Sequence, residues 1–377
     1  MLNVINFLKE HKIEDLNELG ITVKEYPNCV LLSYSQIDSP KENPIVMECR
    51  GLILSNDYKS ILCKSFTRFF NYGECVNSQK NFSFENAVVY EKVDGSLVRF
   101  WKDNVTGEWN ISTRQMAYGE GLTSSNINTF SEAVKKCFYS KEDYNEFCRK
   151  LDEYNSRYTY VFEFVSPENR VVKNYGSEYA LYFLAYFNNE TGEEDTTDGY
   201  INLIKSVQKY GNIKFPQKYA LKDYESIKNY FSNMEATDEG FVVYDNDSGI
   251  RVKIKNPAYL TIAAKRMNGG LTENHIVELI FQNETSEYLT YFNEDAFLIE
   301  PYQKAYDKMM EDIHRVWNEV KDFPRDNAHE RKEFALKISS CPFSDIIFAM
   351  KDGNKISDIF NRKSIRYKIR LISKYKD

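Results

Sequence analysis

Short apolar segments rich in β-branched and aromatic residues recur along roughly the first 255 positions of the chain. Gly, Asn, Asp or Pro bound them, which is the pattern of strands separated by turns. The segments are 30–35, 50–55, 61–66, 87–93, 97–101, 109–114, 160–165, 181–187, 240–245 and 251–255. Helical patterns interrupt them, mainly over 126–154 and 220–233. We therefore predict an α+β domain built on antiparallel sheets with flanking helices.

The pattern changes after Asn256-Pro257, where apolar residues begin to recur every three or four positions. That period predicts helices with one buried face. The longest example consists of Tyr302, Tyr306, Met309, Ile313, Trp317 and Val320. Thr272 is placed to cap a helix through NHIVELIF, and Pro342 to open one through FSDIIFAM. We expect two domains, residues 1–259 carrying the sheets and residues 260–377 all helical.

Composition narrows the function classes. The net charge is −7, so any contact with nucleic acid requires local basic patches. The seven cysteines form no C-x-x-C pair and the four histidines are scattered, so we expect neither a zinc site nor disulfides. The start MLNVINFLKEHK is too charged for a signal peptide, and no apolar run has the length of a membrane helix. We expect a cytoplasmic protein, in the host cytoplasm if it is viral.

Charged residues stand inside several strand-like segments. They are Arg50 in RGLIL, Lys92 in YEKVDG, Glu163 in YVFEFV, Glu239 before GFVVYD, and Lys253 and Lys255 in RVKIK. A charge on a buried strand face is costly unless it is paired or faces a cleft. The recurrence predicts a polar cleft lined by strands.

Two interpretations of YEKVDGSLVRF remain open at this point. Asp94-Gly95 is a common tip for a β-hairpin, and Lys92 is a candidate reactive lysine beside phosphates. Lys253 and Lys255 share one face of a strand, so their ammonium groups repel unless an anion such as a phosphate chain lies between them. Glu163 and Glu239 could hold a ribose hydroxyl or a hydrated Mg²⁺. Taken singly, each feature also fits a solvated edge strand or an ordinary ion pair.

The motifs together resemble a known superfamily. K-V-D-G-S from Lys92, F-E-F around Glu163, E-G-F-V-V from Glu239 and K-I-K from Lys253 resemble motifs I, III, IV and V of covalent nucleotidyltransferases, in the same order. The superfamily comprises DNA ligases, RNA ligases and mRNA-capping guanylyltransferases.

Longer strings resemble the bacteriophage-type RNA ligase 1 family, which repairs broken tRNA. These strings are LLSYS, ECRGLIL, RFFNYGE, EKVDGSLV, FEFVSPENRVV, EGFVVY and KIKNPAY, within about residues 30–260. Ser96-Leu97 departs from the DNA ligases and capping enzymes, which usually carry Arg at the position of Leu97.

The resemblance implies an ATP-dependent RNA ligase. Lys92 would attack the α-phosphate of ATP and hold AMP as lysyl-AMP. The AMP would pass to an RNA 5′-phosphate, and a 3′-hydroxyl would then displace it and seal the strand. The implied cofactors are ATP and Mg²⁺, with Mn²⁺ able to substitute. The implied partners are single-stranded RNA ends, such as breaks in tRNA anticodon loops; we expect a monomer that does not bind membranes.

The resemblance also assigns roles to residues. The nucleotide would contact Tyr34, Arg50, Arg68, Phe70, Lys92, Glu163, Lys253 and Lys255. Glu239 would hold metal-bound water, Glu287 falls near an acidic metal position, Arg114 would reach the triphosphate or the RNA end, and Tyr259 would aid the later steps. Arg68 stands where related ligases tend to have Lys. Asp94 and Gly95 would shape the turn that presents Lys92.

Other readings remain. The chain is alternatively a DNA ligase or capping guanylyltransferase, or an RNA-binding module with a vestigial nucleotide site. The tail NRKSIRYKIRLISKYKD carries seven basic residues against one acid, which suits either an RNA-backbone contact or an ordinary solvated helix face. From the resemblance, we expect the helical domain to contribute to the choice of tRNA.

Overall fold

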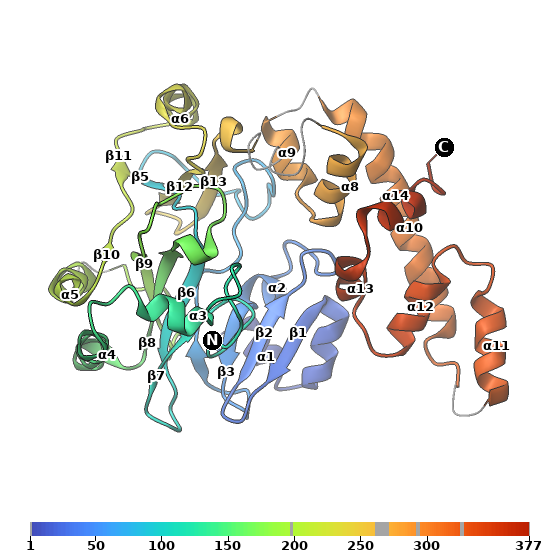
Figure 1. The fold of residues 1–377 in the computed structure, drawn as a ribbon, viewed down its shortest axis with the longest axis horizontal. Coiled ribbons are helices and arrows are strands. Elements are labelled where there is room, and N and C mark those ends of the chain that lie inside the picture. The colour runs from blue at the N-terminus through green and yellow to red at the C-terminus, as the bar shows by residue number, and fades with distance from the viewer. Residues whose placement is uncertain (1, 197–198, 261–270, 292–294, 325–327, 377) are drawn as a thin grey trace. The chain divides into compact units, whose positions relative to one another are not determined.

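The computed structural model describes residues 2–196, 199–260, 271–291, 295–324 and 328–376 (Figure 1). Contacts divide the chain into two compact units. The first unit comprises Met1–Ser35 and Ser39–Ala263, and the second comprises Gln36–Asp38 and Ala264–Asp377.

The first unit is mixed α and β. Its strands are β1 (Ile21–Glu25), β2 (Val30–Tyr34), β3 (Arg50–Leu54), β4 (Ile61–Cys63), β5 (Ala87–Glu91), β6 (Ser96–Lys102), β7 (Trp109–Ser112), β8 (Tyr158–Val165), β9 (Ala180–Asn188), β10 (Ile213–Lys214), β11 (Lys218–Tyr219), β12 (Gly240–Asp245) and β13 (Arg251–Lys255). Its helices are α1 (Asn3–Phe7), α2 (Pro44–Glu48), α3 (Phe130–Lys135), α4 (Lys141–Asn155), α5 (Gly199–Val207) and α6 (Tyr224–Tyr230).

The strands form three sheets, ordered β1-β2-β3-β4, β10-β9-β8-β6-β7 and β11-β5-β12-β13. All ten predicted strand segments are confirmed, and the sheets are antiparallel except where the short β10 lies parallel to β9. The segment predicted helical over 126–154 is two helices, α3 and α4. The short strands β1, β10 and β11 were not predicted. Each has only two to five residues with little apolar content, so no alternation of apolar and polar positions can be recognised.

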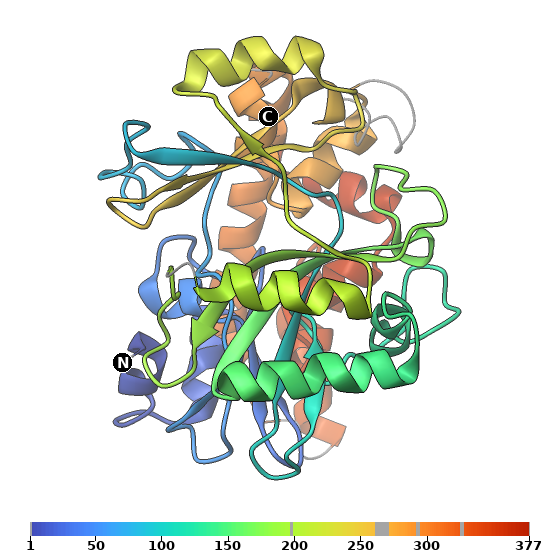
Figure 2. The same cartoon turned by 90° about the vertical axis from the view of Figure 1, so that its left-hand side faces the viewer.

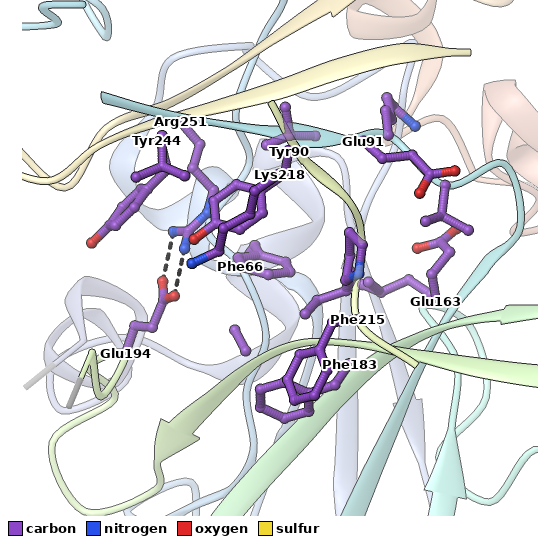
Figure 3. Close-up of a pocket in the computed structure, with 18 of the residues that line it drawn as sticks. Phe66, Tyr90, Glu91, Glu163, Phe183, Glu194, Phe215, Lys218, Tyr244 and Arg251 are labelled. Carbon is purple, nitrogen blue, oxygen red and sulfur yellow. Dashed lines mark hydrogen bonds and ion pairs between the residues drawn. The ribbon is translucent and has the colours of Figure 1, made fainter. Parts of the chain in front are cut away.

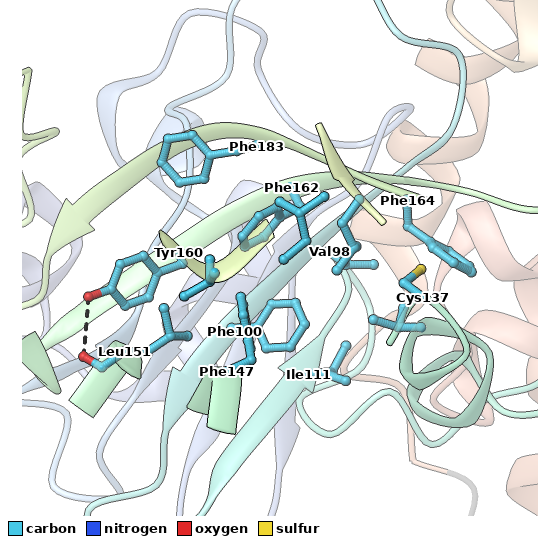
Figure 4. Close-up of a cluster of buried hydrophobic side chains, with 14 of the residues drawn as sticks. Val98, Phe100, Ile111, Cys137, Phe147, Leu151, Tyr160, Phe162, Phe164 and Phe183 are labelled. Carbon is cyan, nitrogen blue, oxygen red and sulfur yellow. Dashed lines mark hydrogen bonds between the residues drawn. The ribbon is translucent and has the colours of Figure 1, made fainter. Parts of the chain in front are cut away.

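Alternation along β8 builds both faces of the five-stranded sheet. Tyr160, Phe162 and Phe164 point into the largest aromatic core, where they pack against residues of α3, α4 and α5 (Figure 4). Figure 2 shows α4 and α5 side by side over this face. Because side chains alternate along a strand, Glu163 points to the opposite face. The aromatic residues of YVFEFV are therefore buried under helices, and its one carboxylate lies on the other face of the sheet.

The sheet β11-β5-β12-β13 follows the same rule. Val89, Val243 and Val252 pack on one face with Ile227 of α6. The alternate positions of β5, β12 and β13 face the other way, toward β8 and β9. One face of this sheet is therefore apolar and covered by a helix, and the other face is largely polar.

Of the two interpretations left open for Asp94-Gly95, the β-hairpin is wrong. β5 and β6 belong to different sheets, so residues 92–95 carry the chain from one sheet to the other and close no hairpin. Pairing partners are decided by the tertiary structure, and a D-G dipeptide between apolar runs does not report them.

The second unit is helical in the part of the chain that the structure describes. Its helices are α8 (Glu273–Phe281), α9 (Thr285–Tyr291), α10 (Ala296–Val320), α11 (Ala328–Ile338), α12 (Ser344–Lys351), α13 (Ile356–Arg362) and α14 (Ile365–Ile372). The predicted stripe on α10 packs in the main core of this unit, and Thr272 caps α8 by accepting a bond from His275 N. The helix expected to open at Pro342 begins at Ser344. Across the described residues, no helix combines the length and apolar character needed to cross a membrane.

A paired glycine experiment tests the close packing of β12 on β13. Gly240 has φ +129°, and a Cβ there would collide with the Ile254 carbonyl oxygen, whereas Gly249 at the turn has φ +69° with open space around it. We expect Gly240→Ala to lower the free energy of unfolding by at least about 2 kcal/mol more than Gly249→Ala, because only the first adds a clash to the backbone strain. Urea titration followed by circular dichroism measures both. Equal losses would show that φ alone, and not the close strand approach, makes Gly240 necessary.

Candidate active site

A cavity of about 600 Å³ lies in the first unit between the polar face of β5, β12 and β13 and the strands β8 and β9 (Figure 3). The polar cleft predicted from charged strands is therefore present. Residues predicted for the site that line it are Arg50, Lys92, Glu163, Glu239, Lys253 and Lys255. The structure brings these together from five separate stretches of sequence.

Strand register arranges the polar face in three rows. Backbone pairing defines them as Lys92–Gly240–Lys255, Tyr90–Val242–Lys253 and Val88–Tyr244–Arg251. Successive rows are two residues apart along each strand, or roughly 6.6 Å. The first row therefore lies roughly 13 Å from the third, so the two ends of the cleft have different chemistry.

The first row carries the candidate nucleophile. Lys92 Nζ lies 2.6 Å from Glu239 Oε2, and Lys255 Nζ lies 3.4 Å from Glu239 Oε1. The exposed fraction of the Glu239 side chain is only 8%, against 21% for Lys92. Lys92 N also donates to Gly240 O at 2.9 Å, which fixes the backbone beside the carboxylate. One carboxylate thus holds two lysines at the floor of the cleft.

Asp94 anchors the segment that follows Lys92. Its Oδ2 accepts bonds from Val172 N at 2.8 Å and Lys173 N at 2.6 Å, and its Oδ1 accepts one from Tyr259 Oη at 2.9 Å. A Cβ on Gly95 would collide with the Phe164 carbonyl oxygen, so the chain passes β8 only because residue 95 is glycine. In K-V-D-G, the aspartate and glycine therefore hold Lys92 in place without forming a hairpin tip. Tyr259, predicted to aid the later steps, is buried and bound to Asp94.

Glu163 faces the same end of the cleft. Burial raises the pKa of its carboxyl to about 7. The charges of Lys92 and Arg50 act against that rise, and those of Glu239 and Asp94 add to it. Near neutral pH this group is therefore poised between a neutral acid and a carboxylate, and it gains its charge most easily when cations gather beside it.

Phe69 lines the cavity, whereas Phe70, the residue predicted to contact the nucleotide, does not. Arg50 and Lys253 both lie over the Phe69 ring, each 5.5 Å from its centroid. Phe70 is buried against Arg68. Consecutive residues of an extended segment point to opposite sides, and the sequence FF does not say which of the two faces the cleft.

Tyr34, Arg68 and Arg114 form a separate group that does not line the cavity. The Arg68 and Arg114 guanidiniums lie 4.4 Å and 4.2 Å from the Tyr34 ring centroid, and Arg114 Nη2 donates to Tyr34 O at 2.6 Å. Arg68 Nη1 and Arg114 Nε are buried with no hydrogen-bond partner among the described residues. Burial lowers the pKa of Arg114, and the charges of Arg50 and Arg68 lower it further. This cationic group is therefore suited to an anion.

Few protein side chains at the cleft are available as ligands for a metal ion. Within the described stretches, no cluster of three or more His, Cys, Asp or Glu side chains is arranged to hold a metal ion. Glu287 lies in α9, and its side chain falls outside the described residues. A metal at the cleft would therefore combine Glu239 with phosphate and water ligands, as Mg²⁺ commonly does.

Several residues that line the cavity are not among the site residues predicted from the sequence. They are Phe66, Tyr90, Phe183, Glu194, Phe215, Lys218, Tyr244 and Arg251. Tyr90, Tyr244 and Arg251 were predictable in principle, because they lie an even number of residues from Lys92, Val242 and Lys253 on the same strands. Glu194 and Phe215 lie on connections between elements, where no periodicity exists.

The model of the RNA ligase family matches residues 48–259, more than half of the chain. The chain therefore belongs to the RNA ligase family, and the resemblance of its motifs to RNA ligases is confirmed. It is 31% identical over 317 residues to a protein of Autographa californica nuclear polyhedrosis virus named as a bifunctional polynucleotide kinase/RNA ligase, covering 81% of this chain and 44% of that protein. The chain thus matches less than half of that relative's length.

An RNA ligase of Rhodothermus phage RM378 is 23% identical over 404 residues, covering 92% of this chain and 90% of the phage protein. Among solved structures, an archaeal ATP-dependent RNA ligase matches with a TM-score of 0.44 and 12% identity, over 89% of this chain and 78% of that one.

The raised pKa of Glu163 predicts a pH-dependent stability in the absence of nucleotide. The folded chain holds this proton up to about pH 7, while the unfolded chain releases it near 4.5, so stability falls as pH rises through that window. We expect Glu163→Gln, which cannot ionise, to be more stable than the native chain at pH 8 by about 1–3 kcal/mol and equally stable at pH 4.5.

Thermal unfolding at both pH values measures this difference. Glu153→Gln serves as a control, because Glu153 is exposed on α4 and outside the cleft. Parallel pH profiles for the native chain and Glu163→Gln would contradict the assignment.

Proposed function

We propose that this chain is an ATP-dependent RNA ligase that carries AMP on Lys92 and joins a 5′-phosphate to a 3′-hydroxyl. The observation that carries the proposal is Lys92 held 2.6 Å from Glu239, beside Lys255, at the floor of a cavity of about 600 Å³. Membership of the RNA ligase family supports the same conclusion.

In the first step, the uncharged Lys92 amine attacks the α-phosphorus of ATP. A P–N bond forms, the bond from the α-phosphorus to the bridging oxygen breaks, and pyrophosphate leaves. The Lys92 ammonium must first release a proton to solvent, because a protonated amine has no free electron pair, and a second proton leaves the nitrogen as the P–N bond forms. Lys253, Lys255 and Arg50 lie where they stabilise the charge that develops on the phosphates.

Glu163 supports this step from the opposite wall. It faces the first row from β8, where it accepts hydrogen bonds from the ribose hydroxyls in its ionised form. The aromatic part of the cleft around Tyr90, Phe183 and Phe215 receives the base. Phosphates therefore lie toward the lysines, and the base toward the aromatic residues.

A divalent cation fits this site as a companion of the nucleotide. Glu239 would be its carboxylate contact, and the remaining ligands would be phosphate oxygens and water. Bound there, Mg²⁺ or Mn²⁺ supplies positive charge that neutralises the polyphosphate. Glu239 would hold the cation or its bound water in place of its contact with Lys92.

Two further transfers complete the reaction. An oxygen of the RNA 5′-phosphate attacks the phosphorus of lysyl-AMP, and the P–N bond breaks to give RNA-adenylate while Lys92 regains a proton. The RNA 3′-hydroxyl then attacks the 5′-phosphorus, loses its proton and expels AMP. Arg68 and Arg114 offer the buried, unpaired N–H groups that hold the pyrophosphate or the RNA phosphate during these transfers.

The substrate class is RNA ends, and by resemblance to phage-type ligases the natural substrate is a cleaved tRNA in the host cytoplasm. The helical second unit offers a surface for tRNA. Arg366 and Arg370 are one turn apart on α14, both exposed, and neither has an ion-pair partner in the part of the chain that the structure describes. Such cations suit contact with phosphates.

Covalent labelling tests the proposed activity. The protein incubated with α-³²P-ATP and Mg²⁺ and then denatured retains the label. Lys92→Ala loses it, and Lys102→Ala keeps it because Lys102 lies outside the cleft. An RNA with a 5′-phosphate then discharges the label and is sealed. An unlabelled native protein, or one that seals only nicked duplex DNA, would refute the proposal.

The role of α14 is tested by replacing its two exposed arginines. Arg366→Gln with Arg370→Gln should weaken binding of cleaved tRNA about threefold to tenfold and lower the slope of log K against log salt by about 0.7 per lost contact. Self-adenylylation should not change. Arg315→Gln is the matched control, because that exposed arginine is already paired with Asp312 and Glu319. Unaltered tRNA binding in the double variant would exclude α14 as the contact.

A further inference from the structure

The end of the cleft opposite Lys92 is closed by a forked ion pair between its two walls. Arg251 Nη1 lies 2.6 Å from Glu194 Oε2, and Arg251 Nη2 contacts Glu194 Oε1 (Figure 3). Only 15% of the Arg251 side chain and 18% of the Glu194 side chain are exposed. Both groups line the cavity. A bidentate pair of this kind has both directional bonds and charge attraction.

Each partner is fixed firmly to its own wall. Arg251 stands at the start of β13, and its guanidinium lies 4.0 Å from the ring centroid of Tyr244 on the neighbouring β12. Glu194 follows β9 and is bridged to Phe187 by backbone pairing, while Asp195 N donates to Tyr186 O at 3.1 Å. The pair therefore joins the sheet β11-β5-β12-β13 to the five-stranded sheet across the cavity. Neither side chain can therefore move far relative to the sheet that carries it.

The position of the pair along the strands gives it a role toward the nucleotide. Arg251 belongs to the third row, and Lys255 of the same strand belongs to the first. Four residues of strand, roughly 13 Å, separate them, which is comparable to the length of an extended nucleoside monophosphate. When the α-phosphate of a nucleotide contacts Lys92 and its base lies beside Tyr90 and Phe183, the far edge of the base lies near the Arg251–Glu194 pair.

We propose that Arg251 and Glu194 are positioning residues that form a latch across the base end of the cleft and set the spacing of its walls for the nucleobase. This inference rests on the proposed function, because it takes the cavity as the ATP site. Arg251 engages both Glu194 oxygens, so the pair acts by holding the two walls at a fixed spacing. Loss of the latch therefore weakens nucleotide binding while leaving the chemistry at Lys92 intact.

The test measures equilibrium binding of α,β-methylene-ATP with Mg²⁺ to the full chain, because its bridging carbon prevents loss of pyrophosphate. Four variants are compared with the native protein: Arg251→Met, Glu194→Gln, the charge swap Arg251→Glu with Glu194→Arg, and the control Arg157→Met. Arg157 pairs with Glu190 beside the same β9 connection, but both are largely exposed, at 70% and 60%. Thermal unfolding of each variant shows whether it is folded.

We expect Arg251→Met and Glu194→Gln to raise Kd about tenfold, with the rate of Lys92 labelling at saturating ATP within about threefold of native, a change in binding and not in chemistry. The charge swap should recover most of the affinity, and Arg157→Met should match the native protein. Native affinity in a folded Arg251→Met or Glu194→Gln would overturn the latch. So would a folded charge swap as weak as the single variants, since Arg251 would then be contacting the nucleotide itself.

The outcomes separate the latch from the proposed function. If the native chain binds the analogue but ATP leaves no label on Lys92, the ligase chemistry fails while the comparison of Kd values still decides the latch. If Arg251→Met does not fold, Glu194→Gln, which keeps the shape of the side chain, decides it. If the native chain does not bind the analogue at all, both are overturned.

Discussion

The ion pair between Lys92 and Glu239 is the interaction on which the rest of the site depends. It places a cation and an anion in a largely enclosed position, and removal of Glu239 costs about 3–5 kcal/mol because the ammonium groups of Lys92 and Lys255 then lose their shared carboxylate. Lys255 shares the same carboxylate, so the floor of the cleft carries more positive than negative charge. That imbalance suits a polyphosphate, and it explains why lysines and a glutamate occur within otherwise apolar strands.

The surrounding fold holds this pair in register. Gly240 lets β12 approach β13 closely, and its carbonyl accepts a bond from Lys92 N on the β5 side of the same strand. Gly95 lets the chain pass the β8 backbone into the next sheet. Asp94 ties that crossing to residues 172–173 and to Tyr259. The K-V-D-G string is therefore a crossing between two sheets, each of which contributes one wall of the cleft. Glu163 reaches the pair from the second wall, and its raised pKa reflects the same enclosed space.

Local periodicity predicted much of this arrangement. The alternation in YVFEFV and RVKIK shows which residues share a face, and the order of the motifs in the RNA ligase resemblance implied that Lys92, Glu163, Glu239 and Lys255 meet. Features that depend on tertiary contacts could not be predicted from local periodicity. The sequence could not show that β5 and β6 enter different sheets, nor that Phe69 and not Phe70 turns inward. It gave no sign of the Arg251–Glu194 pair either, since the partners are 57 residues apart and one lies on a connection.

The central claim is that Lys92 receives the nucleotide. Its most direct test is peptide mapping by mass spectrometry after incubation of the native chain with ATP and Mg²⁺ at neutral pH. The account predicts a single AMP, on the peptide that contains Lys92. Lys64 is the strongest rival, because burial lowers the pKa of its amine to about 8, yet it lies outside the cleft. AMP on Lys64 or any other lysine, with Lys92 unmodified, would contradict the account.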